Sequence, residues 1–139
     1  MNTRSLFILL LAVAMPGCAN FSQPVDLAPR EGKIVSHGVI SATSMVPRRT
    51  LMIVDIDRRI YQGTIESTDA NETFGLVLAF GQKGGAAESA GMPGYYYRAT
   101  LSSSDNHLLR CDFTGDAGRQ RNGICVDDFR RVYDVLSSQ

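Results

Sequence analysis

Short stretches of alternating apolar and polar residues, separated by turn residues, constrain the fold of this chain more than any other feature. In residues 60–66, for example, Tyr61, Gly63 and Ile65 would share one face of an extended strand, with polar residues on the other. No window beyond the first residues carries a long apolar period of 3.6 residues, so we expect little helix. The pattern predicts a mainly β fold, either a small antiparallel β barrel or a sandwich.

One segment is predicted to be a central strand. In residues 73–80 the large apolar side chains from Phe74 to Phe80 share one face, and the other face is small and apolar. A strand that is apolar on both faces suits a position covered on both sides. The glycine-rich residues 81–94 that follow are expected to form a loop.

Three segments of the chain resemble one another: residues 54–61, 103–108 and 126–133. Each places acidic or amide turn residues just ahead of a predicted strand. We interpret this likeness as recurring hairpin chemistry in preference to a true repeat. The arginine pairs that begin at Arg48, Arg58 and Arg130 are expected to be solvated turn charges.

The N-terminus carries a targeting pattern. Arg4 precedes the apolar run of residues 6–15, which is followed by Pro16-Gly17-Cys18. This run is shorter than the roughly 20 apolar residues that a spanning helix needs, and it is typical of a signal peptide core. A cysteine directly after such a core, preceded by a small residue, resembles the lipobox of bacterial lipoproteins.

That resemblance implies that residues 1–17 are a signal peptide, that the Cys18 thiol carries a diacylglyceryl group, and that the new amino terminus is acylated. Because Ala19 and not Asp follows Cys18, we expect the outer membrane, with the protein facing the periplasm. Residues 18–35 would then be the lipidated N-terminus and a flexible tether, and residues 36–139 a single β domain. Two alternatives stay open: an ordinary signal peptide that leaves Cys18 free, and an uncleaved N-terminal helix.

Cys111 and Cys125 lie in predicted neighbouring strands, at a separation that allows a cross-strand bridge. In an oxidising periplasm we expect a disulfide, worth about 3 kcal/mol in the chain-entropy model. The alternative is a pair of reduced, buried cysteines. No second cysteine pair and no histidine cluster completes a zinc site, so no metal or other cofactor is predicted.

The C-terminal part has a second resemblance. The residues from Ala99 to Phe113, then Gly123-Ile-Cys-Val-Asp-Asp and Arg131-Val-Tyr-Asp-Val, look like the C-terminal part of small uncharacterised bacterial lipoproteins. There a serine- and aspartate-rich turn, a cysteine strand, a glycine-cysteine-acidic turn and a tyrosine strand follow one another. The resemblance implies an architecture and no activity.

The candidate surface for a partner is Tyr95, Tyr96, Tyr97 and Arg98. In a strand one tyrosine must point opposite to the other two, so at least one is expected to be exposed or at a rim. Tyrosine and arginine are frequent in contacts with proteins and sugars. The alternative is a strand that uses tyrosine for its β propensity.

Charge and motifs narrow the function. Lys and Arg together number 14, as do Asp and Glu, and this balance argues against nucleic acid as a partner. Ser104, Asp105 and His107 invite a hydrolase interpretation, but adjacent residues of this kind are more typical of a turn. His37 is interpreted as a surface histidine, and Asp127-Asp128 as a turn, since it lacks the further oxygen ligands of a calcium loop.

The leading hypothesis is a non-catalytic, lipid-anchored envelope lipoprotein that binds or supports another envelope component, either a protein or a cell-wall glycan. The first alternative is a periplasmic protein similar to the inhibitors of cell-wall-degrading lysozyme, which are also small, disulfide-bearing β lipoproteins. The second is an envelope hydrolase that uses His107.

Overall fold

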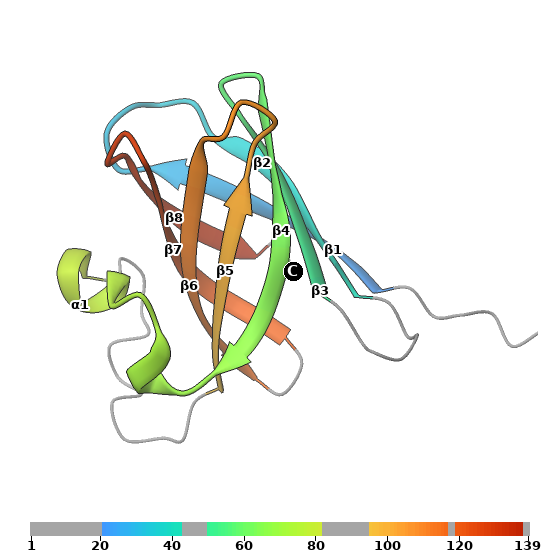
Figure 1. Ribbon diagram of the computed structural model, residues 1–139, viewed down its shortest axis with the longest axis vertical. Helices are drawn as coiled ribbons and strands as arrows, with labels where there is room; N and C mark the ends of the chain where they lie inside the picture. Colours follow the sequence, from blue (N-terminus) through green and yellow to red (C-terminus); the bar gives the residue numbers. More distant parts are fainter. Residues whose placement is uncertain (1–20, 43–49, 82–94, 117–118, 138–139) are drawn as a thin grey trace, which may run out of the picture.

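The computed structural model describes residues 21–42, 50–81, 95–116 and 119–137. These residues form one closed barrel of eight antiparallel strands, each paired with its neighbours in the chain, with the last strand closing on the first (Figure 1). The mainly β prediction is confirmed, and of its two architectures the chain adopts the barrel. The strands are β1 Phe21–Pro29, β2 Ser36–Ala42, β3 Thr50–Ile56, β4 Arg59–Thr68, β5 Tyr95–Ser102, β6 Leu108–Asp116, β7 Arg119–Asp127 and β8 Val132–Ser137.

Alternation along each strand fills the barrel interior. In β3, Met52, Val54 and Ile56 are buried, whereas Ile53 and Asp55 between them are exposed. A barrel of eight strands has an interior just wide enough for side chains. The buried cluster has members on all eight strands: Val25, Leu27, Ile40, Met52, Val54, Ile56, Tyr61, Ile65, Tyr97, Ala99, Leu101, Leu109, Cys111, Phe113, Cys125, Tyr133 and Val135. The centre of the barrel is therefore a packed core.

The first strand corrects the predicted tether of residues 18–35. β1 pairs with both β2 and β8 and buries Val25 and Leu27, so the described β domain begins at residue 21 and not at residue 36. Pro24 and Pro29 suggested a break in the chain, but each lies where β1 has one neighbour among the described strands. Pro24 pairs only with β2 and Pro29 only with β8. A proline is tolerated in a strand where its missing N–H has no neighbour to serve.

The predicted central strand at residues 73–80 is wrong. After a 3₁₀ turn at Ala70–Glu72, the chain forms the short helix α1, Leu76–Phe80, on the outside of the barrel (Figure 1). Gly75 has a φ of 68°, a left-handed conformation that interrupts an extended strand. In the helix Leu76 is buried and Leu78 is 93% exposed. A short apolar run does not distinguish a strand from a helical segment by periodicity alone, which is why the sequence misled.

A buried carboxylate anchors this segment to the barrel. Asp112 lies on the outer side of β6 and is 3% exposed. Its two oxygens accept the backbone N–H groups of Phe74 and Leu76, each at 2.9 Å. The N–H of Phe74 precedes α1 and that of Leu76 belongs to its first turn. The first N–H groups of a helix have no partner within the helix, and Asp112 supplies one. Asp112 thereby fixes the start of α1 over β6 and β7.

Arg30 holds the other end of α1. Its guanidinium donates to the carbonyl oxygens of Phe80 and Gly81, and it binds both oxygens of Asp134 on β8, at 3.0 and 2.6 Å. Arg30 and Asp134 are both largely buried, and the hydrogen bond to Asp134 raises the pKa of Arg30.

In the described ranges no helix is long and apolar enough to cross a membrane. The predicted loop at residues 81–94 lies outside the described residues, except for Gly81.

Candidate functional site

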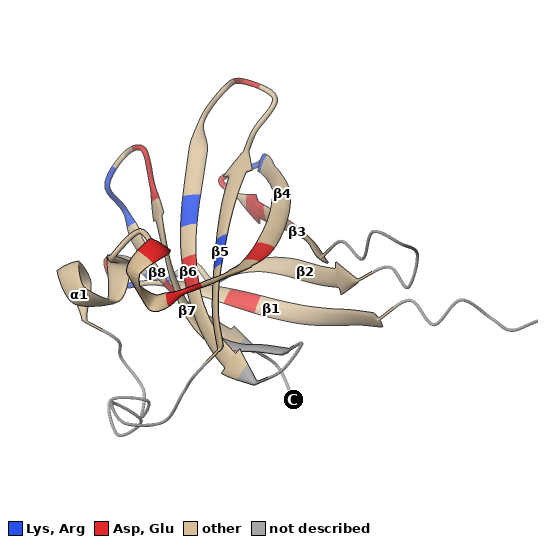
Figure 2. Ribbon diagram, turned by 60° about the horizontal axis from the view of Figure 1, so that its bottom comes forward, with Lys and Arg blue, Asp and Glu red and all other residues tan. Residues whose placement is uncertain are grey.

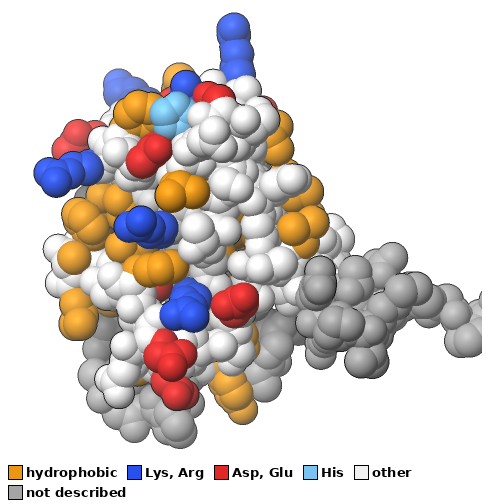
Figure 3. Space-filling view, in the orientation of Figure 1, with side chains coloured by type: hydrophobic (Ala, Val, Ile, Leu, Met, Phe, Trp, Pro, Cys, Tyr) orange, Lys and Arg blue, Asp and Glu red, His pale blue; other side chains and the backbone are white. Residues whose placement is uncertain are grey.

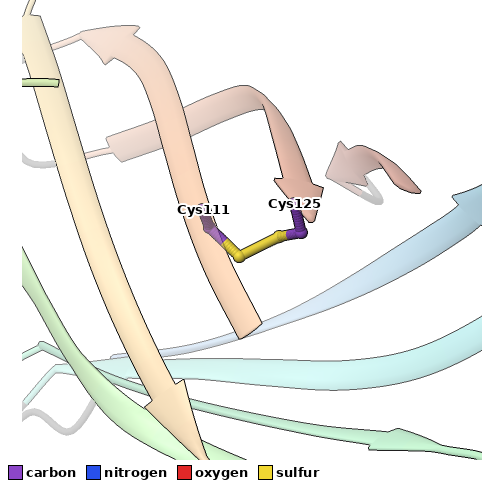
Figure 4. Close-up of a disulfide and its surroundings, with 2 residues drawn as sticks. All are labelled: Cys111 and Cys125. Carbon is purple, nitrogen blue, oxygen red and sulfur yellow. A yellow bond between two sulfur atoms is a disulfide. The ribbon is translucent and has the colours of Figure 1, made fainter. Parts of the chain in front are cut away.

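The two cysteines of the predicted bridge are paired. Cys111 on β6 and Cys125 on β7 lie directly opposite each other, with their Cα atoms 4.1 Å apart and their sulfur atoms bonded at 2.00 Å (Figure 4). Both side chains point into the packed core, where neither is exposed. The disulfide therefore fastens the β6–β7 pair inside the barrel. Cys18, the predicted lipidation site, lies outside the described residues.

The four residues of the predicted partner surface do not come together. Alternation leaves Tyr95 51% exposed, turns Tyr96 to the opposite side, and buries Tyr97 in the core. Arg98 lies 3.9 Å from the Glu66 carboxylate and donates to the backbone carbonyl of Glu72 at 3.0 Å. Tyr96 and Arg98 therefore share the outer face of β5 while Tyr95 and Tyr97 lie on the inner one, and the four residues form no common patch.

The three similar segments meet at one end of the barrel. The turns β3–β4, β5–β6 and β7–β8 and the loop β1–β2 all lie at this end, which we call the turn end (Figure 1, top). In the space-filling view, acidic, basic and hydrophobic side chains gather there beside a histidine (Figure 3). Alternating strand direction brings the turns after odd-numbered strands to one end. Residues far apart in the sequence thus become neighbours.

The likeness of the segments reflects turn chemistry, as predicted. In the turns at 103–107 and 127–131, the fourth residue donates its N–H to the carbonyl of the first, at 3.1 and 3.0 Å, and has a φ of 65° and 64°. This is the three-residue hairpin loop that ends in a left-handed residue. The β3–β4 turn is shorter, and its two residues, Asp57 and Arg58, both have a positive φ. Its shape matches the twist of the strands it joins.

A buried aspartate fixes the β7–β8 turn. Asp127 is 4% exposed and accepts two hydrogen bonds from Arg131, one from the backbone N–H at 2.8 Å and one from the side-chain Nε at 2.7 Å. It also accepts the hydroxyl of Tyr133 at 3.3 Å. Burial, followed by the charge of Asp127, raises the pKa of Tyr133 well above its usual range. Arg131 also binds Asp57, so it joins the β7–β8 turn to the β3–β4 turn.

A second ion pair joins the β3–β4 hairpin to the β5–β6 turn. The Nε of Arg59 donates to Asp105 at 2.7 Å, and the Ser103 hydroxyl donates to the other oxygen of Asp105 at 2.5 Å. These hydrogen bonds, Arg59 first, lower the pKa of Asp105 from 3.8 to about 2. Three separate turns are thus connected through Arg59 and Arg131.

His107 lies between two carboxylates. Its Nδ1 is 2.9 Å from Asp128 and its Nε2 is 3.7 Å from Asp105, and the hydrogen bond from His107 lowers the pKa of Asp128. The nearby Ser103 hydroxyl donates to Asp105 and accepts the backbone N–H of His107 at 3.1 Å, as in a turn. Within the described residues, no serine or threonine hydroxyl donates a hydrogen bond to the imidazole of His107. His37, at the other side of this end, lies 2.7 Å from Asp26.

One aromatic side chain stands exposed within this network. Phe129 is 51% exposed, with the guanidinium groups of Arg59 and Arg131 at 5.7 and 5.4 Å from its ring centre and the His107 ring at 4.8 Å. We call these four residues the Phe129 surface. A rigid aromatic ring beside arginines is the composition found at the centres of protein interfaces. In the sequence, the likeness of the three hairpin segments is the one signal that points to the Phe129 surface. The arginines of these segments were interpreted as solvated turn charges, so the surface was not predicted.

A groove lies beside the Phe129 surface, under the β1–β2 loop. It has a volume of about 610 Å³ and is lined, among others, by Ile34, Val35, Arg58, Arg131 and Tyr133. Ile34 and Val35 are exposed apolar residues, so this groove combines an apolar wall with a charged one. Arg131 belongs both to this groove and to the Phe129 surface, and the two features are therefore continuous.

In the described part of the chain, no three His, Cys, Asp or Glu side chains are grouped so that they could hold a metal ion. Searches against protein-family models, curated proteins and solved structures found no match for this chain.

Proposed function

We propose that the protein is a lipid-anchored, non-catalytic component of the bacterial cell envelope, which binds another envelope component through the Phe129 surface. Its precursor is cut before Cys18, and the lipid on Cys18 holds it at the outer membrane, facing the periplasm. The leader pattern supports the anchor, and a disulfide between Cys111 and Cys125 is at home in an oxidising compartment. The partner is a protein or a cell-wall glycan.

The observation that carries the proposal is the half-exposed ring of Phe129 on a frame of connected turns. Arg59 and Arg131, which flank the ring, are themselves held by Asp105 and Asp127. Side chains that are already ordered lose little entropy when a partner binds, and this favours affinity.

Two features favour binding over catalysis. The barrel interior is filled by side chains, so a ligand would meet the outside of the barrel and not a cavity within it. The ring nitrogens of His107 face Asp128 and Asp105, and the imidazole packs against Phe129. This arrangement positions His107 as a part of the surface.

The binding proposal is tested by photo-crosslinking in whole cells. A benzophenone amino acid replaces Phe129 in one strain, and Ile60 or Tyr95 in two control strains. All three positions are 51% exposed, which makes them matched in access to a neighbour. We expect one reproducible adduct from position 129, identified by mass spectrometry after digestion of the cell wall, and none of that mass from position 60.

The outcomes separate the alternatives. An adduct from position 95 and none from position 129 would return the binding role to the tyrosine strand and refute the Phe129 surface. No adduct from any position would contradict the binding proposal. The anchor is tested separately by the intact mass of the membrane-bound protein, which should be that of a chain starting at Cys18 with acyl groups added, and by Cys18→Ser, which should release the protein from the membrane.

A further inference from the structure

The barrel begins very close to the proposed anchor. Between Cys18 and Phe21, the first residue of β1, stand only Ala19 and Asn20. Because each residue extends a chain by at most about 3.6 Å, the Cα atoms of Cys18 and Phe21 lie within roughly 11 Å of each other. An acylated cysteine sits at the boundary between headgroups and acyl chains. A lipid on Cys18 therefore brings the start of β1 to the bilayer surface.

Within the described strands, the stretches nearest the start of β1 carry no charge, while Arg48 and Arg49, which precede Thr50 in the sequence, lie outside the described residues. Residues 21–25, 38–42, 50–54 and 62–65 lie side by side on β1 to β4 and contain no Lys, Arg, Asp, Glu or His. We call them the uncharged surface. Figure 2 shows β2 and the adjoining ends of β1 and β3 free of acidic and basic residues.

Apolar side chains face outward on this surface. Val39 on β2 pairs with Ile53 on β3, and both are exposed on the outer side of the barrel. Phe21 lies on the same side of β1 as the buried Val25 and Leu27, at the open end of the barrel, where it pairs with Ala42 and is 40% exposed. Aromatic and aliphatic side chains gain by entering the headgroup region, whereas acidic side chains are repelled by anionic headgroups.

We propose that the barrel touches the lipid bilayer that holds the anchor at the start of β1 and at the adjoining part of the uncharged surface, with Phe21 in the headgroup region, the strands inclined to the bilayer and the turn end directed away from the membrane. This inference rests on the proposed lipidation of Cys18, and it adds an orientation. β1 has nine residues and rises about 3.3 Å per residue, so the turn end stands up to roughly 30 Å from the bilayer. The Phe129 surface is then presented to the periplasm.

The chain suits a fluorescence test because it contains no tryptophan. Phe21→Trp, Ile53→Trp and Ile60→Trp are each made in the full-length precursor, and the lipidated proteins are reconstituted into vesicles of phosphatidylethanolamine and phosphatidylglycerol with brominated acyl chains. Leu78→Trp, on the opposite side of the barrel and 93% exposed, is the control (Figure 1). Emission is compared with that in unbrominated vesicles.

We expect the emission of F21W to fall by about half in brominated vesicles, that of I53W to fall less, and those of I60W and L78W to be nearly unchanged, because only side chains in the interface contact the bromine atoms. Circular dichroism of each variant confirms that the barrel is folded. The gradient from position 21 to position 60 is the signature of one fixed orientation.

The results distinguish the two proposals. A reconstituted protein without acyl mass would refute the proposed function itself. A lipidated, vesicle-bound protein in which the F21W emission is not quenched would overturn the orientation and leave the anchor intact. If that unquenched emission were also shifted to the blue, a second copy or another protein would cover the surface in place of lipid. Equal quenching at positions 21, 60 and 78 would also overturn it, because the barrel would then have no preferred face toward the lipid.

Discussion

The turn end and the uncharged surface are parts of one barrel, built with the same alternation of residues, yet they differ almost completely in charge. At the turn end, Arg59 and Arg131 connect three turns through Asp105, Asp127 and Asp57. The uncharged surface has no ionisable side chain, although it spans four strands. Both parts enclose the same packed core. The difference in charge therefore concerns the contacts that each part makes at its surface and not the closure of the barrel. It teaches that the ion pairs between Arg59 and Asp105 and between Arg131, Asp57 and Asp127 serve to connect the turns.

The largest expected effect is loss of the disulfide. Replacing Cys111 and Cys125 with Ala should lower the free energy of unfolding by about 3 kcal/mol, measured by urea denaturation, because the unfolded chain regains the freedom of a closed loop. Dithiothreitol should destabilise the native protein by a similar amount and leave the double variant unchanged. A loss confined to the turn end in hydrogen exchange would show that the bridge serves that end and not the whole barrel.

Next comes the buried carboxylate of the turn end. Asp127→Ala leaves two donors of Arg131 and the hydroxyl of Tyr133 without their acceptor, and should cost about 2 kcal/mol in urea denaturation. The matched control is Asp55→Ala, which removes an exposed carboxylate from β3 and should change stability by less than about 0.5 kcal/mol. Equal effects of the two substitutions would mean that the ion pairs do not hold the turns.

A smaller effect is expected from the exposed pair of Arg59 and Asp105, and it should depend on pH. The pKa of Asp105 is lowered from 3.8 to about 2 in the folded protein, so its charge stabilises the fold above about pH 4 and this contribution is lost as the pH falls toward 2. The melting temperature of the native protein should exceed that of Asp105→Asn at pH 5 to 7. That difference should shrink near pH 2, and a difference that stays constant would contradict the assignment.

The smallest effect on stability is expected on the uncharged surface. Ile53→Glu should change the free energy of unfolding by less than about 0.5 kcal/mol, because the side chain is exposed. In the F21W background it should nevertheless reduce quenching by brominated lipid, because an acidic side chain is repelled by anionic headgroups. Ile60→Glu introduces the same charge at an exposed site of β4 outside the uncharged surface, and it should leave the quenching unchanged.

The sequence contained enough to predict strands and the cysteine pair. Strict alternation in residues 60–66 and the position of Cys111 and Cys125 in adjacent strands are local patterns, and local patterns are visible in a sequence. The choice of a barrel over a sandwich was not visible, because it depends on the pairing of β1 with β8 from the far end of the chain. The prolines of β1 concealed that strand, since only the finished barrel reveals which N–H groups have no neighbour.

The candidate site was harder to predict than the fold. The likeness of the three hairpin segments was apparent, but the meeting of Arg59, His107 and Phe129 depends on barrel closure. Charged turn residues are usually solvated, and a single sequence does not reveal which of them pair across turns. The tyrosines at 95–97, by contrast, attracted attention by composition, and strand alternation sent them to different sides.

Pro24 lies in the one stretch of β1 that has no partner on β8 among the described strands. From Phe21 to Pro24, β1 extends past the end of β8, so among the described strands one edge of this stretch is open. Open strand edges are templates for the addition of a strand from another molecule. Proline has no N–H to offer to such a strand. At the start of β1, where the proposed lipid anchor would bring neighbouring copies together, Pro24 thus offers an added strand one donor fewer.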